Sequence, residues 1–305
     1  MILIMRVLVL ITAVVAFVGG LAVTASAHSA STYRIPYARW GRTMQILTVS
    51  SAGGHLSQLT HESVMSDDPS VSRDGSKIVY DRGGDRSNTR DIWTMNADGS
   101  DKRRITFTPR IFEAKPSWSP DGSKIAYVTG TGLWVMNSDG SDRHRLSGRP
   151  SYGAPSWSAD GTKIVFSDFN DLHSPGGGHL AIISAVDGRV ERRLPGGRAP
   201  AWSLDGRTIV FARKGNDGKG DGVGSSDLYL VNADGTGFHQ LTNSPGLYAV
   251  FSSWSPDGSQ IIFWANQVNR APDTLRLYVM NADGSNRHWL GVAVTSEWWG
   301  GLGDF

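Results

Sequence analysis

The chain has 305 residues, of which 39% are hydrophobic and 19% are charged, and it contains no cysteine. This length can bury a large core, and the absence of cysteine excludes disulfides, thiolate metal sites and cysteine nucleophiles. Basic side chains number 30 and acidic ones 28, with the two signs interspersed, so we expect no nucleic-acid interface. The 37 glycines and 11 tryptophans are typical of many short strands joined by tight turns, which predicts an all-β fold.

Residues 1–27 are predicted to be a secretory signal peptide. Arg6 precedes an apolar run over residues 7–23, and the small residues Ala-Ser-Ala at 25–27 form a cleavage site before His28. Cleavage leaves residues 28–32 as a short linker and predicts a bacterial protein exported to the periplasm or the extracellular space. The alternative is an uncleaved helix that tethers a sensor domain to the membrane, since the run approaches the length of a span. We expect no membrane span after cleavage.

A Ser-x-Asp-Gly turn recurs five times in the rest of the chain. Each copy follows a short segment that usually contains tryptophan and precedes an apolar segment such as KIVYD or KIAYV. Because glycine accepts the positive φ of a tight turn, Asp-Gly between apolar segments predicts a β-hairpin. The turn aspartates are Asp74, Asp121, Asp160, Asp205 and Asp257, and the preceding tryptophans are Trp118, Trp157, Trp202 and Trp254.

Each of these units is predicted to be a four-stranded antiparallel meander. After the first hairpin a second apolar strand runs into another Asp-Gly turn, such as NADGS at Asp98, and a last short strand closes the unit. A repeat of about 40 to 50 residues is the size of one propeller blade. The middle strands are apolar on both faces, as expected for sheets packed between two neighbours.

The two ends of the chain supply the parts of one further unit. Residues 33–60 match the second, third and fourth strands of a unit, and residues 296–305 (SEWWGGLGDF) match its missing first strand, with Trp298 in the phase of Trp118. Pairing of this split blade would close residues 33–305 into a six-bladed β-propeller with no open sheet edge. The alternatives are five blades with ragged ends or a solenoid.

The segment PSWSPDGSKIAYV followed by LWVMNSDGSDRHRLS is similar to the WD-like repeats of the TolB family, and the resemblance covers residues 33–305. It implies a β-propeller but no particular activity, because related propellers accompany peptidase domains or form pectate-degrading lyases. TolB carries an additional α/β domain ahead of its propeller, which we do not find here, so a role in the Tol-Pal system transfers only in part. We find no Gly-x-Ser-x-Gly elbow and expect no serine peptidase.

The loops on one face of the predicted disc are nearly uniform Asp-Gly turns, whereas those on the other face differ from blade to blade. Function tends to reside in variable loops on a rigid scaffold, so we expect the binding surface on this variable-loop face. Its aromatic and arginine residues are of the types that anchor interfaces, although scattered rim positions are the alternative. The candidate binding residues are Arg110, Phe112, Tyr152, Tyr248 and Arg270.

One variable loop carries a possible divalent-metal set. His173 and His179 share it with Asp168 and Asp171, and imidazole with carboxylate suits such a metal. The proline and glycines between them favour an ordinary flexible loop.

With no catalytic residues identified and no cofactor expected, the sequence favours a non-enzymatic, monomeric binding or scaffold module of the cell envelope, with a protein or glycan partner. The alternative is a metal-dependent polysaccharide lyase or hydrolase built on the propeller.

Overall fold

The computed structural model describes residues 32–40, 42–83, 89–148, 153–168, 179–214, 226–243, 247–267 and 274–295. Contacts divide the chain into two units, Met1–Ser31 and Thr32–Phe305, and every described residue lies in the second. The described residues form strands and turns, with no helix and hence no helical membrane span. The predicted all-β class is confirmed.

Three sheets are four-stranded antiparallel meanders of consecutive strands, as the repeat predicts. In each sheet the first and third of the three hairpins are closed by the Asp-Gly turns identified in the sequence. The strands are β4 (Ser66–Val71), β5 (Lys77–Gly83), β6 (Arg90–Asn96) and β7 (Arg103–Arg104); β8 (Glu113–Trp118), β9 (Lys124–Thr129), β10 (Gly132–Asn137) and β11 (His144–Ser147); and β12 (Ser156–Trp157), β13 (Lys163–Asp168), β14 (His179–Ser184) and β15 (Val190–Leu194).

The last eight strands form one continuous sheet that consists of two such meanders. A single parallel pair, Ser226 with Tyr248, joins the two halves, and β19 pairs with β18 beside that junction. The strands are β16 (Arg198–Trp202), β17 (Thr208–Lys214), β18 (Ser226–Asn232) and β19 (His239–Gln240), followed by β20 (Leu247–Trp254), β21 (Gln260–Gln267), β22 (Thr274–Asn281) and β23 (His288–Thr295).

The first sheet has three described strands, β1 (Arg34–Trp40), β2 (Met44–Ser50) and β3 (Ser57–Gln58). Its apolar side chains form one hydrophobic cluster with side chains of β20, β21 and β22. Within it, the ring of Tyr37 lies edge-on to that of Trp264, with 5.9 Å between the centroids. The predicted fourth strand, residues 296–305, lies outside the described residues.

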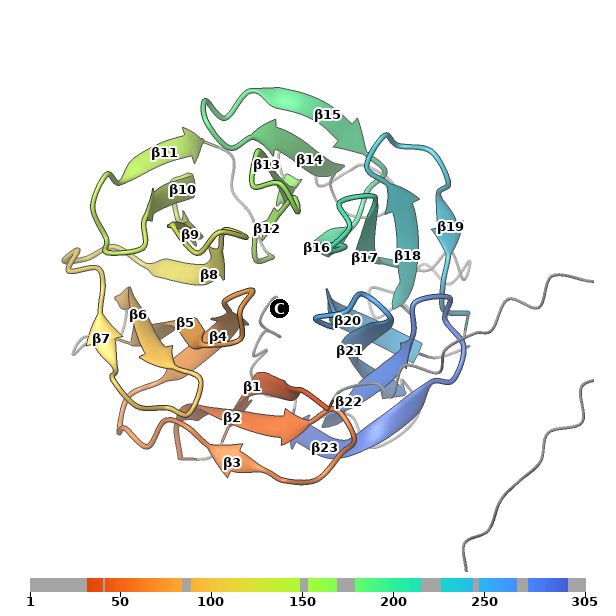
Figure 1. Ribbon diagram of the computed structural model, residues 1–305, viewed down its shortest axis with the longest axis horizontal. Helices are drawn as coiled ribbons and strands as arrows, with labels where there is room; N and C mark the ends of the chain where they lie inside the picture. The colour runs from red at the N-terminus through yellow and green to blue at the C-terminus, as the bar shows by residue number, and fades with distance from the viewer. Residues whose placement is uncertain are drawn as a thin grey trace, which may run out of the picture. The chain divides into compact units, whose positions relative to one another are not determined.

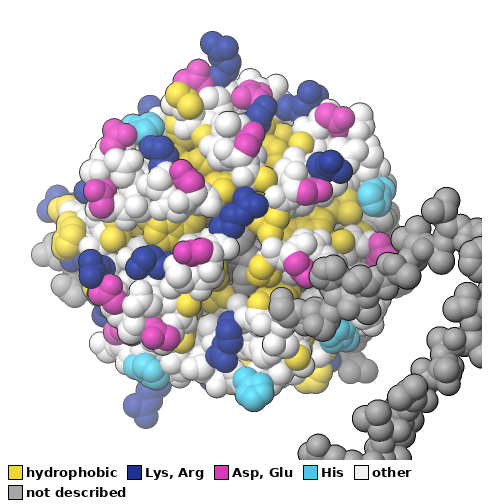
Figure 2. Space-filling model, in the orientation of Figure 1, with side chains coloured by type: hydrophobic (Ala, Val, Ile, Leu, Met, Phe, Trp, Pro, Cys, Tyr) yellow, Lys and Arg dark blue, Asp and Glu magenta, His cyan; other side chains and the backbone are white. Residues whose placement is uncertain are grey.

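The sheets follow one another around a common centre, with β4, β8, β12, β16 and β20 innermost (Figure 1). This arrangement is propeller-like. A small cavity of about 50 Å³ at the centre is lined by residues of these five strands. On the visible surface, acidic and basic side chains are interspersed (Figure 2).

The first turn of each repeat is fixed by local hydrogen bonds that the motif itself encodes. In the sheet of β8 and β9, the hydroxyl of Ser119 donates to Oδ1 of Asp121 at 2.6 Å, and the amide of Ser123 donates to the same oxygen at 3.0 Å. These hydrogen bonds stabilise the carboxylate and lower the pKa of Asp121 to about 2. The motif therefore specifies the hairpin without help from distant residues.

Each sheet is buried on both faces because its neighbours cover both. On β13, Ile164 and Phe166 pack with Ala126 and Val128 of the preceding sheet, whereas Val165, between them, packs with Ile209 of the following sheet. Side chains alternate between the faces of a strand, so one strand supplies two interfaces. This explains the continuous apolar runs in the sequence.

Close packing between sheets predicts different costs for two glycine substitutions. Gly188 and Gly122 both have a left-handed backbone, with φ of 68° and 69°. A Cβ on Gly188 would lie 1.9 Å from the carbonyl oxygen of Leu146 in the preceding sheet, whereas a Cβ on Gly122 would meet no atom within 4 Å. We expect Gly122→Ala to lower the free energy of unfolding by about 1 kcal/mol through backbone strain alone.

Gly188→Ala should cost at least about 2 kcal/mol more, because the sheets must separate to admit the methyl group. Urea denaturation of the two variants measures the difference. Equal losses would contradict the inter-sheet contact.

Candidate functional site

The structure describes three of the five predicted binding residues. Arg110 and Phe112 lie on the connection between β7 and β8, and Tyr248 lies in β20, all on the variable-loop face. Tyr152 and Arg270 lie outside the described residues. Arg110 has a left-handed φ of 66°, an uncommon conformation for a residue with a Cβ.

The connection between β7 and β8 exposes three large apolar side chains. Phe107 is 64% exposed, Ile111 41% and Phe112 46%. We call these three residues the 107–112 patch. Neighbouring exposed apolar side chains are a feature of interaction sites, whereas single ones are ordinary.

Two arginines from the adjoining sheet hold the aromatic rings of this patch. The guanidinium carbon of Arg104 lies 4.5 Å from the ring centroid of Phe107, and that of Arg90 lies 5.0 Å from Phe112. The backbones of Arg90 and Phe112 also form a parallel bridge. The patch is therefore fixed to the start of β6 and to β7, which reduces the entropy lost when a partner binds.

Beneath the patch lies a cluster of charged residues, the buried Asp67, Asp68 and Asp81 with the partly buried Arg90 and Lys115, which we call the ion cluster. Nη1 of Arg90 lies 2.7 Å from Oδ1 of Asp81 and 3.3 Å from Oδ2 of Asp67. Nζ of Lys115 lies 3.5 Å from Oδ2 of Asp68, and its amide donates to Oδ2 of Asp81 at 3.2 Å. The cluster thus links β4, β5 and β6 to β8 of the next sheet.

Three carboxylates in the ion cluster face two cations. Burial, with repulsion from Asp68, raises the pKa of Asp67 to about 6 against the attraction of Arg90 and Lys115. Burial also raises the pKa of Asp81 well above its usual value. One oxygen from each carboxylate lies within 4.8 Å of the others, a spacing that could hold a metal ion. Arg90 and Lys115 already form ion pairs with these carboxylates, so the geometry favours an internal ion network over a metal site.

Four of the five innermost strands, β4, β8, β16 and β20, carry a bulge at one shared repeat position, six residues before the turn aspartate. Asp68, Lys115, Ala199 and Phe251 occupy it with φ between 44° and 55°. Nζ of Lys115 lies 5.8 Å from the ring centroid of Phe251, so side chains of β8 and β20 meet across the centre. The bulges of β8 and β20 therefore bring the side chains of Lys115 and Phe251 together at the mouth of the central space on the variable-loop face.

A further arginine and aromatic pair lies on the same face. The guanidinium carbon of Arg198, the first residue of β16, lies 5.4 Å from the ring centroid of Tyr248. Both side chains are partly buried. Tyr248 is thus placed in a contact that joins the two halves of the last sheet.

The structure describes two of the four residues of the predicted metal set, Asp168 and His179. Asp168 is buried at the end of β13, opposite His179 in the register of the sheet. Nη1 of Arg193 on β15 lies 2.8 Å from Oδ2 of Asp168. Because a guanidinium already neutralises this carboxylate, Asp168 is poorly suited to bind a metal cation. Asp171 and His173 lie outside the described residues.

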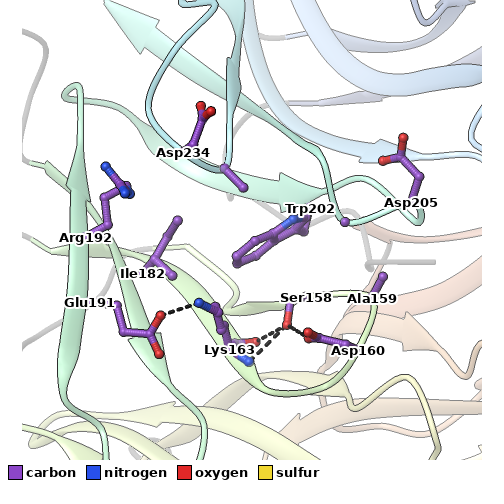
Figure 3. Close-up of a pocket in the computed structure, with 12 residues that line it drawn as sticks. Ser158, Ala159, Asp160, Lys163, Ile182, Glu191, Arg192, Trp202, Asp205 and Asp234 are labelled. Atoms are coloured by element: carbon purple, nitrogen blue, oxygen red, sulfur yellow. Dashed lines mark hydrogen bonds and ion pairs between the residues drawn. The ribbon is translucent and has the colours of Figure 1, made fainter.

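A groove of about 460 Å³ opens beside the Asp-Gly turns, and Trp202 is among the residues that line it (Figure 3). The ion pair between Lys163 and Glu191 crosses one side of it. The hydroxyl of Ser158 donates to Asp160 at 2.6 Å, and this hydrogen bond is the main cause that lowers the pKa of the carboxyl. The carboxylates here serve the repeated turns, which favours a structural role.

The ion cluster and Arg198 were missed by the sequence reasoning. Asp68 and Lys115 share one repeat phase, where Ala199 and Phe251 stand in other units. Charged residues at a phase that is otherwise uncharged were a signal that an alignment of the repeats could have detected. No local motif marks Asp81 or Arg198.

The innermost strands, the two-sided burial and the repeated turns define a β-propeller. A family model described as the TolB beta propeller domain (PD40) matches residues 13–198, more than half of the chain. The chain therefore belongs to the TolB beta propeller domain family, which confirms the resemblance of the repeats. A comparison with curated protein sequences found no match.

Solved structures share the fold at low sequence identity. TolB from Acinetobacter baumannii has a TM-score of 0.68 and 17% identity, covering 88% of this chain and 65% of that one. An oligogalacturonate lyase from Vibrio parahaemolyticus has a TM-score of 0.53 and 16% identity, covering 85% and 73%. A chain of a nidogen/laminin complex has a TM-score of 0.62 and 11% identity, covering 90% and 97%. These likenesses concern the fold alone.

The ion cluster predicts an unusual pH dependence of stability. The pKa of Asp67 is about 6 in the folded protein, whereas the ordinary value of 3.8 applies in the unfolded chain. The folded state binds this proton more tightly than the unfolded chain does, so the contribution of Asp67 to stability falls as the pH rises from about 4 to about 6. In the variant Asp67→Asn, residue 67 cannot ionise, so the ion cluster keeps two carboxylates and two cations. We expect its free energy of unfolding, relative to wild type, to rise by about 1 to 3 kcal/mol over this range.

Urea denaturation at several pH values measures this difference. Asp98→Asn is the control, because hydrogen bonds from Ser100 lower the pKa of the exposed Asp98 carboxyl. The control should lose stability relative to wild type as the pH rises through the acidic range. A flat difference for Asp67→Asn would contradict the assigned charge imbalance.

Proposed function

We propose that this protein is a non-enzymatic, exported β-propeller of the cell envelope that binds a partner protein through its variable-loop face. The observation that carries the proposal is the exposed 107–112 patch, which is held by arginines above the ion cluster. Residues 1–27 act as the export signal, and the mature protein works in the periplasm or outside the cell. No cofactor or catalytic residue is part of the proposal.

The chemistry of the two faces supports this choice. Turn aspartates on one face are engaged by their own serines and amides, as in Ser203 with Asp205 at 2.6 Å. The connections on the other face differ in length and composition from repeat to repeat. Aromatic and arginine residues such as Phe107, Phe112 and Arg110 are the types that carry most binding energy in protein interfaces.

A double substitution in the patch tests the proposal. Phe107→Ser with Phe112→Ser removes exposed aromatic area and leaves the core intact, so partner binding should fall at least about tenfold while the melting temperature changes little. The measurement is capture of envelope proteins on immobilised wild type and variant, followed by titration of the proteins that differ.

Phe238→Ser is the matched control, because Phe238 is 42% exposed beside an Asp-Gly turn. It should bind as wild type does. Loss of the same proteins with the control, or their retention by the double variant, would contradict a partner site at the 107–112 patch.

We further propose that the propeller has six blades and that residues 296–305 close the ring as the innermost strand of the first sheet. A mostly apolar cavity of about 310 Å³ lies between that sheet and the next, lined by Tyr33, Pro36 and Val71 and by Leu204 and Pro256 from other sheets. Its position is where the first strand of the split blade is expected. The Trp298 side chain suits this cavity in size and polarity.

Trp298→Ala should therefore lower the free energy of unfolding by about 3 to 5 kcal/mol, as expected for a large aromatic side chain lost from a core. Trp289→Ala is the control, because Trp289 is 47% exposed, and its cost should be much smaller. Deletion of residues 296–305 should lower the melting temperature at least as far as Trp298→Ala does. An unchanged melting temperature after the deletion would rule out the closed ring.

A further inference from the structure

The arginines of the variable-loop face fall into two groups. Arg90, Arg104 and Arg193 each contact a buried carboxylate at 2.7 to 2.8 Å, which accounts for their positions. The second group, Arg198 with Arg82, Arg213 and Arg276, has an aromatic ring beside each guanidinium and no ion pair with a carboxylate among the described residues. A partly buried guanidinium without an anion leaves its N–H donors available to a ligand.

The backbone around Arg198 is held rigidly. A Cβ on Gly197 would lie 2.2 Å from the Phe211 ring, so the chain passes against the core immediately before Arg198. After it, Ala199 has a φ of 48° and donates its amide to the Ser167 hydroxyl at 3.2 Å. The Tyr248 ring lies on one side of the guanidinium and a rigid backbone precedes it, so its N–H donors are held in place for bidentate binding of a carboxylate.

Arg198 and the apolar 107–112 patch lie on one surface, the variable-loop face. Tyr248 and Phe251 both lie on β20, and Phe251 contacts Lys115 on β8, the strand that begins directly after Phe112. A row of residues thus leads from the patch through Lys115, Phe251 and Tyr248 to Arg198, linked by the Lys115–Phe251 and Arg198–Tyr248 contacts. An extended peptide segment matches this row if its apolar side chains contact the patch and an acidic side chain reaches Arg198.

We propose that Arg198, beside the Tyr248 ring, binds a carboxylate of an acidic, partly apolar peptide segment of the partner protein. This inference rests on the proposed function and specifies the chemistry of the partner. The apolar patch on the same face favours a peptide over an acidic polysaccharide, which lacks apolar side chains to bury there.

Two labelled peptides of equal length and leucine content test the proposal, one with glutamates and the other with glutamines at the same positions. Fluorescence anisotropy measures their binding to the purified wild-type protein. The glutamate peptide should bind at least about tenfold more tightly than the glutamine peptide, and added salt should weaken its binding.

The variant Arg198→Gln should reduce binding of the glutamate peptide about tenfold and abolish the preference for glutamate. The control is Arg189→Gln, an exposed arginine in an Asp-Gly turn, which should bind as wild type does. Circular dichroism establishes that both variants keep the wild-type melting temperature. Tyr248→Phe, which keeps the aromatic face, should retain the preference.

The outcomes separate this inference from the proposed function. If the glutamate peptide binds wild type and Arg198→Gln equally, the assignment of Arg198 is wrong and the protein-binding function survives. If polygalacturonate binds wild type in an Arg198-dependent way while neither peptide binds, the partner is a glycan and both are overturned. If none of the three probes binds wild type, the acidic-peptide assignment is overturned, while the patch variants still test the function.

Discussion

The rest of the structure depends on one constraint, that each sheet must bury both of its faces against neighbouring sheets. Val165 packs towards one neighbour while Ile164 and Phe166 pack towards the other, and every innermost strand is held close to the centre as a result. A stack of such sheets leaves apolar faces open unless its two ends meet. The contact between Tyr37 in the first sheet and Trp264 in the last shows how this chain covers those faces.

Charged side chains lie between the apolar sheets near the variable-loop face. The ion cluster joins β4, β5 and β6 to β8 through Arg90 and Lys115, and Arg90 also contacts Phe112 above it. Removing one partner from such a network costs more than the pair contributes, because an unpaired charge stays buried. The same residues therefore hold two sheets together and support the exposed patch, which ties the proposed binding surface to the scaffold.

The fold was largely predictable because its signals are local. The serine and aspartate of each first turn, such as Ser119 and Asp121, form their hydrogen bonds within five residues, so the motif predicts the hairpin directly. The site was predicted only in part. Phe112 and Tyr248 were identified by type and loop position, but their partners Arg90 and Arg198 come from other strands, and no local pattern indicates such pairings. The buried position of Asp67 likewise depends on Arg90 and Lys115, which follow 23 and 48 residues later in the chain.

The account makes one face of the propeller the contact surface and leaves the Asp-Gly turns to folding. A photo-crosslinking amino acid placed in living cells tests this directly, at Ile111 in the patch and at Val186 in an Asp-Gly turn, both exposed. The account predicts a discrete protein adduct from position 111 and none from position 186. Adducts from position 186 alone, or equally from both, would contradict it.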